Sequence, residues 1–164
     1  MKPALLVIDM QKAFYNGYGV KSMDSTAKMI NRAIALYRKK NYPIIWIQNE
    51  NKKDNLLRGS AGFEFIDALQ PLDNEKRIIK EYANSFNKTD LAEYTAKNGI
   101  DTLIVTGYNA LYCVLSTYRG AMDLDLTPML LKNGSASDKK KNIRLVEDIC
   151  NIISVGILEK FYQE

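Results

Sequence analysis

The sequence predicts an α/β fold in which a parallel sheet is covered by helices on both faces, and three observations support this. Apolar runs of strand length alternate with longer segments whose apolar residues have helical spacing. The strand-length runs are continuously apolar, which is typical of parallel strands buried on both faces. The 164 residues contain no repeat, linker or low-complexity segment, so we expect one domain over residues 1–164.

The order of the elements follows from the same patterns. Residues 25–41 carry apolar side chains three or four positions apart, which indicates a helix, and Ser25 is its predicted N-cap. Gly99 is predicted to end a later helix. Strands are predicted at 4–9, 42–48, 76–82, 101–107, 126–134 and 154–160, and helices at 25–41, 62–72, 89–99, 112–123 and 140–153.

The chain contains no histidine, and this excludes several kinds of chemistry. Ser-His-Asp and Cys-His catalysis both need an imidazole as the base. Most zinc sites also use histidine ligands. Acid–base chemistry near neutral pH must therefore come from carboxylate, lysine, cysteine or tyrosine side chains.

Charge, hydropathy and cysteine content further restrict the partners and the cellular location that we expect. The net charge of +4 is scattered, and the basic runs at 38–40 and 139–144 are expected to be solvated helix faces, so no nucleic-acid partner is predicted. No apolar run reaches the roughly 18 residues of a membrane span. The first ten residues fit a strand better than a signal peptide. Two cysteines 37 positions apart make no disulfide framework, so we expect a cytoplasmic protein with reduced thiols.

Reactive side chains follow three of the predicted strands, at the edge where parallel sheets bind ligands. Asp9 ends the first strand, where partial burial raises a carboxyl pKa and makes it a better base. Lys80 lies near the end of the third strand, where it could pair with Asp9. Cys113 begins the helix after the fourth strand, where the helix dipole and a nearby lysine are expected to lower its pKa. Together these residues allow nucleophilic catalysis without histidine.

Taken singly, each of the three has a simpler interpretation. Asp9 could cap a turn, Lys80 could be a surface lysine, and Cys113 could be a buried apolar residue. Cys150 lies within an apolar helix face and is expected to pack in the core. A thiol-redox role is not favoured, because no Cys-x-x-Cys is present. A receiver-type signalling domain is not favoured either, since Met10 and Gln11 stand where its second acidic residue belongs.

Three separated motifs resemble those of the isochorismatase-like cysteine hydrolases. They are LLVIDMQKAF at 5–14, KEYANSFNKTDL at 80–91 and DTLIVTGYNALYCVLSTYRGA at 101–121. The segment LLRGSAGFEF at 56–65 is also similar to a Gly-Ser-x-Gly segment of that family. The resemblance runs from Ala4 to about Ser137 in the same order as in the family.

The resemblance implies both a fold and a site. The fold is a three-layer sandwich with a six-stranded, mainly parallel sheet in the order 3-2-1-4-5-6. The family's catalytic triad maps onto Asp9, Lys80 and Cys113. A cis peptide is implied at Tyr108–Asn109, which would turn the backbone N–H groups of Asn109 and Cys113 into an oxyanion hole.

The implied reaction is hydrolysis of a small amide or carbamoyl compound. Asp9 takes the thiol proton, Cys113 attacks the carbonyl and forms a thioester, and water then releases the acid. Lys80 stabilises the ionised forms. Nicotinamidases of this superfamily bind a metal through histidines that this chain lacks, and isochorismatases proper lack the cysteine. The resemblance therefore implies a hydrolase without metal or other cofactor.

The same resemblance suggests partners and a pocket wall. The residues expected to contact the small-molecule substrate lie near strand ends and are Gln11, Phe14 and Tyr112, although Gln11 could instead support Asp9. Trp46 lies inside a strand and is expected in the core. Relatives are commonly dimers or tetramers, so a homo-oligomer is expected. The main alternative is a catalytically inactive member of the same fold that binds a small molecule.

Overall fold

The computed structural model describes residues 1–54 and 56–162, and it contains one six-stranded sheet. The strand order is β3-β2-β1-β4-β5-β6, and every neighbouring pair is parallel. The predicted fold class and strand order are confirmed. The strands are β1 (Pro3–Ile8), β2 (Ile44–Asn49), β3 (Lys76–Lys80), β4 (Thr102–Tyr108), β5 (Thr127–Ala136) and β6 (Ile152–Ile153).

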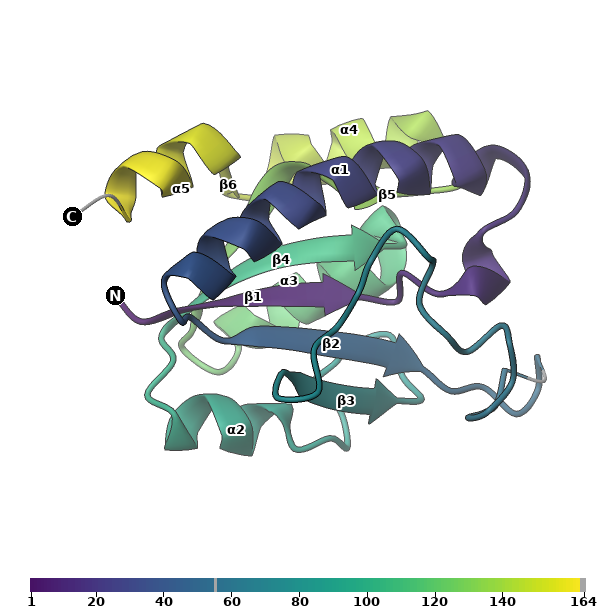
Figure 1. Ribbon diagram of the computed structural model, residues 1–164, viewed down its shortest axis with the longest axis horizontal. Coiled ribbons are helices and arrows are strands. Elements are labelled where there is room, and N and C mark those ends of the chain that lie inside the picture. Colours follow the sequence, from purple (N-terminus) through teal and green to yellow (C-terminus); the bar gives the residue numbers. More distant parts are fainter. Residues whose placement is uncertain (55, 163–164) are drawn as a thin grey trace.

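Helices cover the sheet on both faces (Figure 1). One apolar cluster joins α1 and α5 to one face, and a second joins α2 and α3 to the other. All six residues of β1 are buried, with Leu5 and Val7 in the first cluster and Leu6 and Ile8 in the second. Burial on both faces explains the unbroken apolar run. The helices are α1 (Gly17–Lys39), α2 (Leu91–Lys97), α3 (Leu115–Met122), α4 (Lys140–Ile149) and α5 (Val155–Phe161).

The predicted strand at 154–160 is wrong, because these residues form α5. The Ser154 hydroxyl accepts a hydrogen bond from the Ile157 N–H and caps the helix. Val155 and Leu158 are buried at helical spacing in the same cluster as α1. The sixth strand is instead the short β6, so the predicted helix at 140–153 ends earlier, at Ile149.

Two further predicted elements need correction. The helix expected to start at Ser25 begins at Gly17, and Ser25 lies on its exposed side rather than at its cap. Residues 62–72 form turns rather than a helix, because their backbone pairs with the chain after β1: Gln11 bridges Phe65, and the Ala13 N–H donates to the Gly62 carbonyl. This irregular segment buries the side chains of Phe63, Phe65, Ile66 and Leu69, whereas Leu72 is exposed.

The chain passes from β4 into α3 through a π-helical segment, Ala110–Val114, where a regular helix from Tyr112 was expected. Cys113 lies in this segment. Cys150 follows the last residue of α4 and is partly buried against the second cluster, so it packs at the rim of the core rather than inside it. No helix in residues 1–54 and 56–162 is long and apolar enough to cross a membrane.

Candidate active site

The ends of β1 and β3 bring Asp9 and Lys80 into a buried ion pair. Lys80 Nζ lies 2.7 Å from Asp9 Oδ2, and the two residues are 2% and 1% exposed. In the sheet, β2 separates β1 from β3, so the lysine side chain reaches across the end of β2. The other carboxylate oxygen, Asp9 Oδ1, has no close hydrogen-bond partner among the described residues. That oxygen is available to a third group.

The thiol of Cys113 lies near enough to the ion pair for both Asp9 and Lys80 to affect its pKa. Burial and, secondarily, the Asp9 carboxylate raise the pKa of the Cys113 thiol to about 12, and Lys80 opposes this rise. The predicted lowering of this pKa is wrong. The physical reason is that the thiol in the π-helical segment is largely shielded from water and lies near the Asp9 carboxylate, instead of at an open helix end.

The charges of Asp9 and Lys80 support each other. Burial raises the pKa of the Asp9 carboxyl above its usual value, although the lysine ammonium opposes that rise. Burial lowers the pKa of Lys80, but attraction to Asp9 and Cys113 outweighs burial and the net direction is upward. The ammonium therefore keeps its proton. Moving a proton from the thiol to Asp9 leaves the site's total charge unchanged, so burial does not oppose that transfer.

A close approach between β1 and β4 fixes the backbone beside Asp9. A Cβ on Gly107 would lie 2.0 Å from the carbonyl oxygen of Ile8, and the φ of Gly107 is +122°. Only glycine fits such a position. Asp9, the residue after Ile8, has a φ of +50°.

The Tyr108–Asn109 peptide bond, which follows Gly107, is cis, as the resemblance implied. The Asn109 side chain is held from the end of β5. Its amide nitrogen donates to Asp138 Oδ1 at 3.1 Å, and its carbonyl oxygen accepts from the Ser137 hydroxyl at 3.0 Å. The sequence alone gives Ser137 and Asp138 no role, because their contacts with Asn109 arise only in the folded chain.

Comparisons with known proteins agree with this geometry. The isochorismatase domain model matches residues 3–145. The chain belongs to the isochorismatase family of hydrolases. The isochorismatase family protein YrdC of Bacillus subtilis is 30% identical over 139 residues, which cover 83% of this chain and 74% of that protein.

Solved structures of isochorismatase-family proteins share the fold. An isochorismatase-like hydrolase from Alkaliphilus metalliredigens superposes with a TM-score of 0.90 at 24% identity, covering 99% of this chain and 100% of that one. N-carbamoylsarcosine amidase from Thermoplasma acidophilum has a TM-score of 0.83 at 22% identity, covering 94% of this chain and 97% of that one. At these identities the likeness shows the fold alone.

The three predicted substrate contacts have different surroundings in this isochorismatase-family site. Gln11 is fully buried, and its amide is used by main-chain groups: it donates to the Asn49 and Phe63 carbonyls and accepts from the Asn49 N–H. It therefore fastens the end of β2 to the 56–65 segment, and its amide is not free for a substrate. Phe14 is half-buried and stacks on Tyr108 at 5.2 Å between ring centroids.

Tyr112, the third predicted contact, is 59% exposed on the π-helical segment one residue before Cys113. Trp46 is in the core as expected, and its indole N–H donates to Glu75. Phe14 and Tyr108 thus form an aromatic wall beside Asn109, while Tyr112 is open to solvent.

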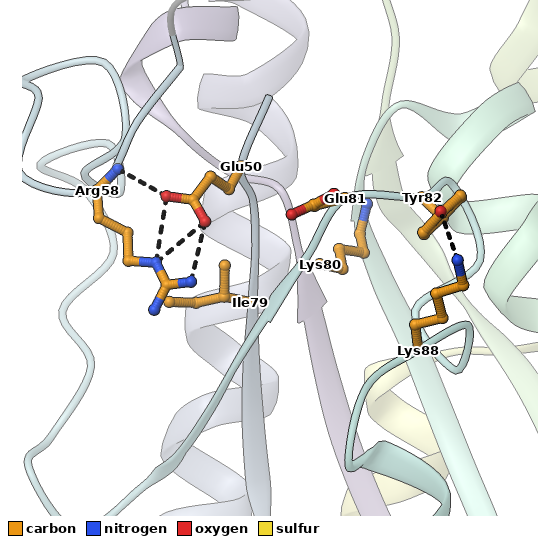
Figure 2. Close-up of a pocket in the computed structure, with 7 residues that line it drawn as sticks. All are labelled: Glu50, Arg58, Ile79, Lys80, Glu81, Tyr82 and Lys88. Carbon is orange, nitrogen blue, oxygen red and sulfur yellow. Dashed lines mark hydrogen bonds and ion pairs between the residues drawn. The ribbon is translucent and has the colours of Figure 1, made fainter. Parts of the chain in front are cut away.

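A cavity of about 300 Å³ opens beside Lys80 where β2 and β3 end (Figure 2). Glu50, the residue after β2, is held there by Arg58, whose guanidinium donates to both carboxylate oxygens at 3.0 to 3.2 Å. Lys88 donates to the Tyr82 hydroxyl on the other side. The residues that line the cavity are Glu50, Arg58, Ile79, Lys80, Glu81, Tyr82 and Lys88.

The segment after β2 is where nicotinamidases of the superfamily carry metal-binding histidines. Here it reads Asn49, Glu50 and Asn51, and the one carboxylate among them is paired with Arg58. Within residues 1–54 and 56–162, no three His, Cys, Asp or Glu side chains are grouped closely enough to hold a metal ion. The donor set at this position does not fit a histidine-based metal site.

Proposed function

We propose that the chain is a cysteine amidase that hydrolyses a small amide or carbamoyl compound with Asp9, Lys80 and Cys113. One observation supports the proposal: Asp9 and Lys80 form a buried ion pair, and the partly buried Cys113 thiol lies near enough for both to affect its pKa. Such a site can move the thiol proton without a histidine.

Acylation begins when Asp9 takes the proton of the Cys113 thiol through the unpartnered Oδ1. The thiolate sulfur attacks the carbonyl carbon of the substrate, and the negative charge moves to the carbonyl oxygen. Backbone N–H groups of Asn109 and Cys113 are the proposed donors to that oxygen. The C–N bond then breaks, and Asp9 returns the proton to the leaving nitrogen, which departs as ammonia or an amine.

Deacylation uses the same groups in the reverse order. Asp9, again a carboxylate, takes a proton from water, and the resulting hydroxide attacks the thioester carbonyl. The C–S bond breaks, and the proton on Asp9 returns to the sulfur of Cys113. Lys80 stays charged throughout and compensates whichever of Asp9 and Cys113 carries the negative charge.

No metal ion enters this reaction. The chain has no histidine, and Glu50 is paired with Arg58. An amidase is favoured over a merely binding member of the fold, because binding alone does not require a charged pair beside a thiol. The amidase activity named for the Thermoplasma acidophilum structure is compatible with the proposal, although at 22% identity it does not identify the substrate.

The experiment that tests this is a panel of small amides and carbamoyl compounds assayed for ammonia or amine release. The wild type is compared with Cys113→Ala and, as the matched control, Cys150→Ala. We expect turnover in the wild type and in Cys150→Ala, unchanged by a chelator, and none in Cys113→Ala. Turnover that survives Cys113→Ala excludes the nucleophile, and turnover lost on chelation excludes the metal-free reaction.

A further inference from the structure

A second cavity lies between α1, the end of β5 and α4, and shares no lining residue with the candidate active site. Its volume is about 390 Å³. Figure 1 shows α1 and α4 passing near the carboxyl half of β5. The short β6 pairs only with Leu130 and Leu131, so no strand among the described residues pairs with residues 132–136 on that side. The cavity occupies this open edge.

The edge is not shaped for adding another strand. From Leu130 to Ser135, five steps of β5 run against only two steps of β4, from Val105 to Gly107. Asn133 within this bulge has a φ of +59°. Bulges of this kind twist an edge away from strand pairing. A ligand that contacts side chains fits this edge better than a second β-strand does.

One buried hydroxyl in the cavity lacks a partner. Ser135 is 2% exposed and lines the cavity, and its Oγ makes no hydrogen bond with any described residue. Buried polar atoms in native proteins are nearly always paired. An oxygen-bearing ligand in the cavity would give this hydroxyl its partner.

The charges around the cavity favour an anion. Lys21 of α1 and Lys140 and Arg144 of α4 line it, against one carboxylate, Glu147. That carboxylate already accepts a hydrogen bond from the Asn133 N–H at 2.8 Å. Three cations against one anion leave two positive charges uncompensated by the lining residues. Cations with hydroxyl groups nearby are the donors that hold phosphate oxygens.

We propose that this cavity binds a small organic molecule that carries a phosphate group. The volume exceeds what a single phosphate needs and lies in the range of small-molecule sites, roughly 300–1,000 Å³. Tyr18, which is 51% exposed, and Ile143 line the same cavity and offer apolar contact to the organic part. The phosphate would lie among Lys140, Arg144 and the Ser135 hydroxyl.

The test is a calorimetric titration with phenyl phosphate, with phenol as the uncharged probe of the same ring. At fixed ionic strength we expect saturable binding of one phenyl phosphate per chain and none of phenol. The Cys113→Ala variant should bind equally well, since the cavity lies outside the candidate active site. Absence of saturable binding, or its loss in Cys113→Ala, overturns the proposal.

Variants locate the site within the fold. The double variant Lys140→Gln/Arg144→Gln should weaken binding at least about tenfold, because it removes two charge-assisted contacts. Lys141→Gln removes one positive charge from α4 outside the cavity, where the double variant removes two within it, and should weaken binding by less than about twofold. Ser135→Ala should weaken binding while leaving the unfolding midpoint unchanged. Equal effects of Lys141→Gln and the double variant would show nonspecific attraction and contradict the proposal.

Discussion

Lys80 Nζ lies 2.7 Å from Asp9 Oδ2 across the end of β2, with both side chains almost completely buried. This contact joins the ends of β1 and β3, and it also holds the carboxylate that we propose as the base. A buried charge without its partner is strongly unfavourable. Breaking the pair should therefore lower the stability of the fold, which can be measured independently of catalysis.

Lys80→Met leaves the Asp9 carboxylate buried without its counter-ion. We expect the free energy of unfolding at pH 7 to fall by about 3–5 kcal/mol, measured by urea denaturation. Adding Asp9→Asn removes the stranded charge, so Lys80→Met/Asp9→Asn should be more stable than Lys80→Met alone. If the double variant is the less stable of the two, the ion pair is not what the lysine contributes.

The raised pKa of Cys113 predicts how its alkylation depends on pH. Only the thiolate reacts, and burial with the Asp9 carboxylate raises the pKa to about 12. The rate of alkylation by iodoacetamide should therefore still be rising above pH 9, where a free thiol is already half ionised. Asp9→Asn removes a negative charge and should move the midpoint to lower pH. The measurement is made in Cys150→Ala, so that only Cys113 is alkylated. A midpoint below that of a free thiol would contradict the burial of Cys113 beside Asp9.

Glu75 predicts an acid-sensitive contribution to stability. Burial alone would raise its pKa, but hydrogen bonds from Arg38, the Leu72 N–H and Trp46 lower it overall. The contribution is therefore present above the unfolded pKa near 4.5 and is lost as pH falls through the lower folded value. Glu75→Gln should cost about 1.5–3 kcal/mol at pH 7 and progressively less in acid, measured by urea denaturation.

The control for Glu75→Gln is Glu159→Gln. Glu159 forms an exposed pair with Arg32 at 3.3 Å, and such pairs contribute no more than about 1 kcal/mol. If Glu159→Gln loses as much stability as Glu75→Gln, burial of the Glu75 contacts does not explain the loss in Glu75→Gln.

Gly107→Ala tests the close approach of β4 to β1. The new methyl group would collide with the Ile8 backbone at a positive φ, and neither strand can move away within the sheet. We expect a loss above about 3 kcal/mol in thermal or urea unfolding. Gly156→Ala in α5, where a Cβ meets nothing within 4 Å, should be neutral or stabilising by about 0.5–1 kcal/mol. Similar effects of both substitutions would exclude the steric explanation.

Much of the fold could be predicted from the sequence because the central strands are buried on both faces. The first apolar run could be recognised as a buried strand, and the structure buries Leu5, Val7 and their neighbours. The predicted strand at the C-terminal end is wrong because its segment is not continuously apolar. Residues 154–160 are short and only half apolar, and the Ser154 cap together with packing against α1 decides for a helix.

Of the candidate site, too, only a part could be predicted from the sequence. Parallel topology alone places Asp9 and Lys80 at one edge, so their approach could be predicted. The pKa of Cys113 could not, because it depends on how deeply the π-helical segment buries the thiol. The position of Gln11 near a strand end predicts a substrate contact, whereas in the structure its amide is bonded to main-chain groups of residues 49 and 63.

The most direct test of the Cys113 nucleophile is mass spectrometry of the acid-quenched protein during turnover of an amide found in the panel. The mechanism predicts an increase in intact mass equal to the acyl group, located on the peptide that contains Cys113 and unchanged in Cys150→Ala. The adduct and the turnover should both disappear in Cys113→Ala. Steady turnover by Cys113→Ala, or an acyl group found on another residue, would contradict the proposed function.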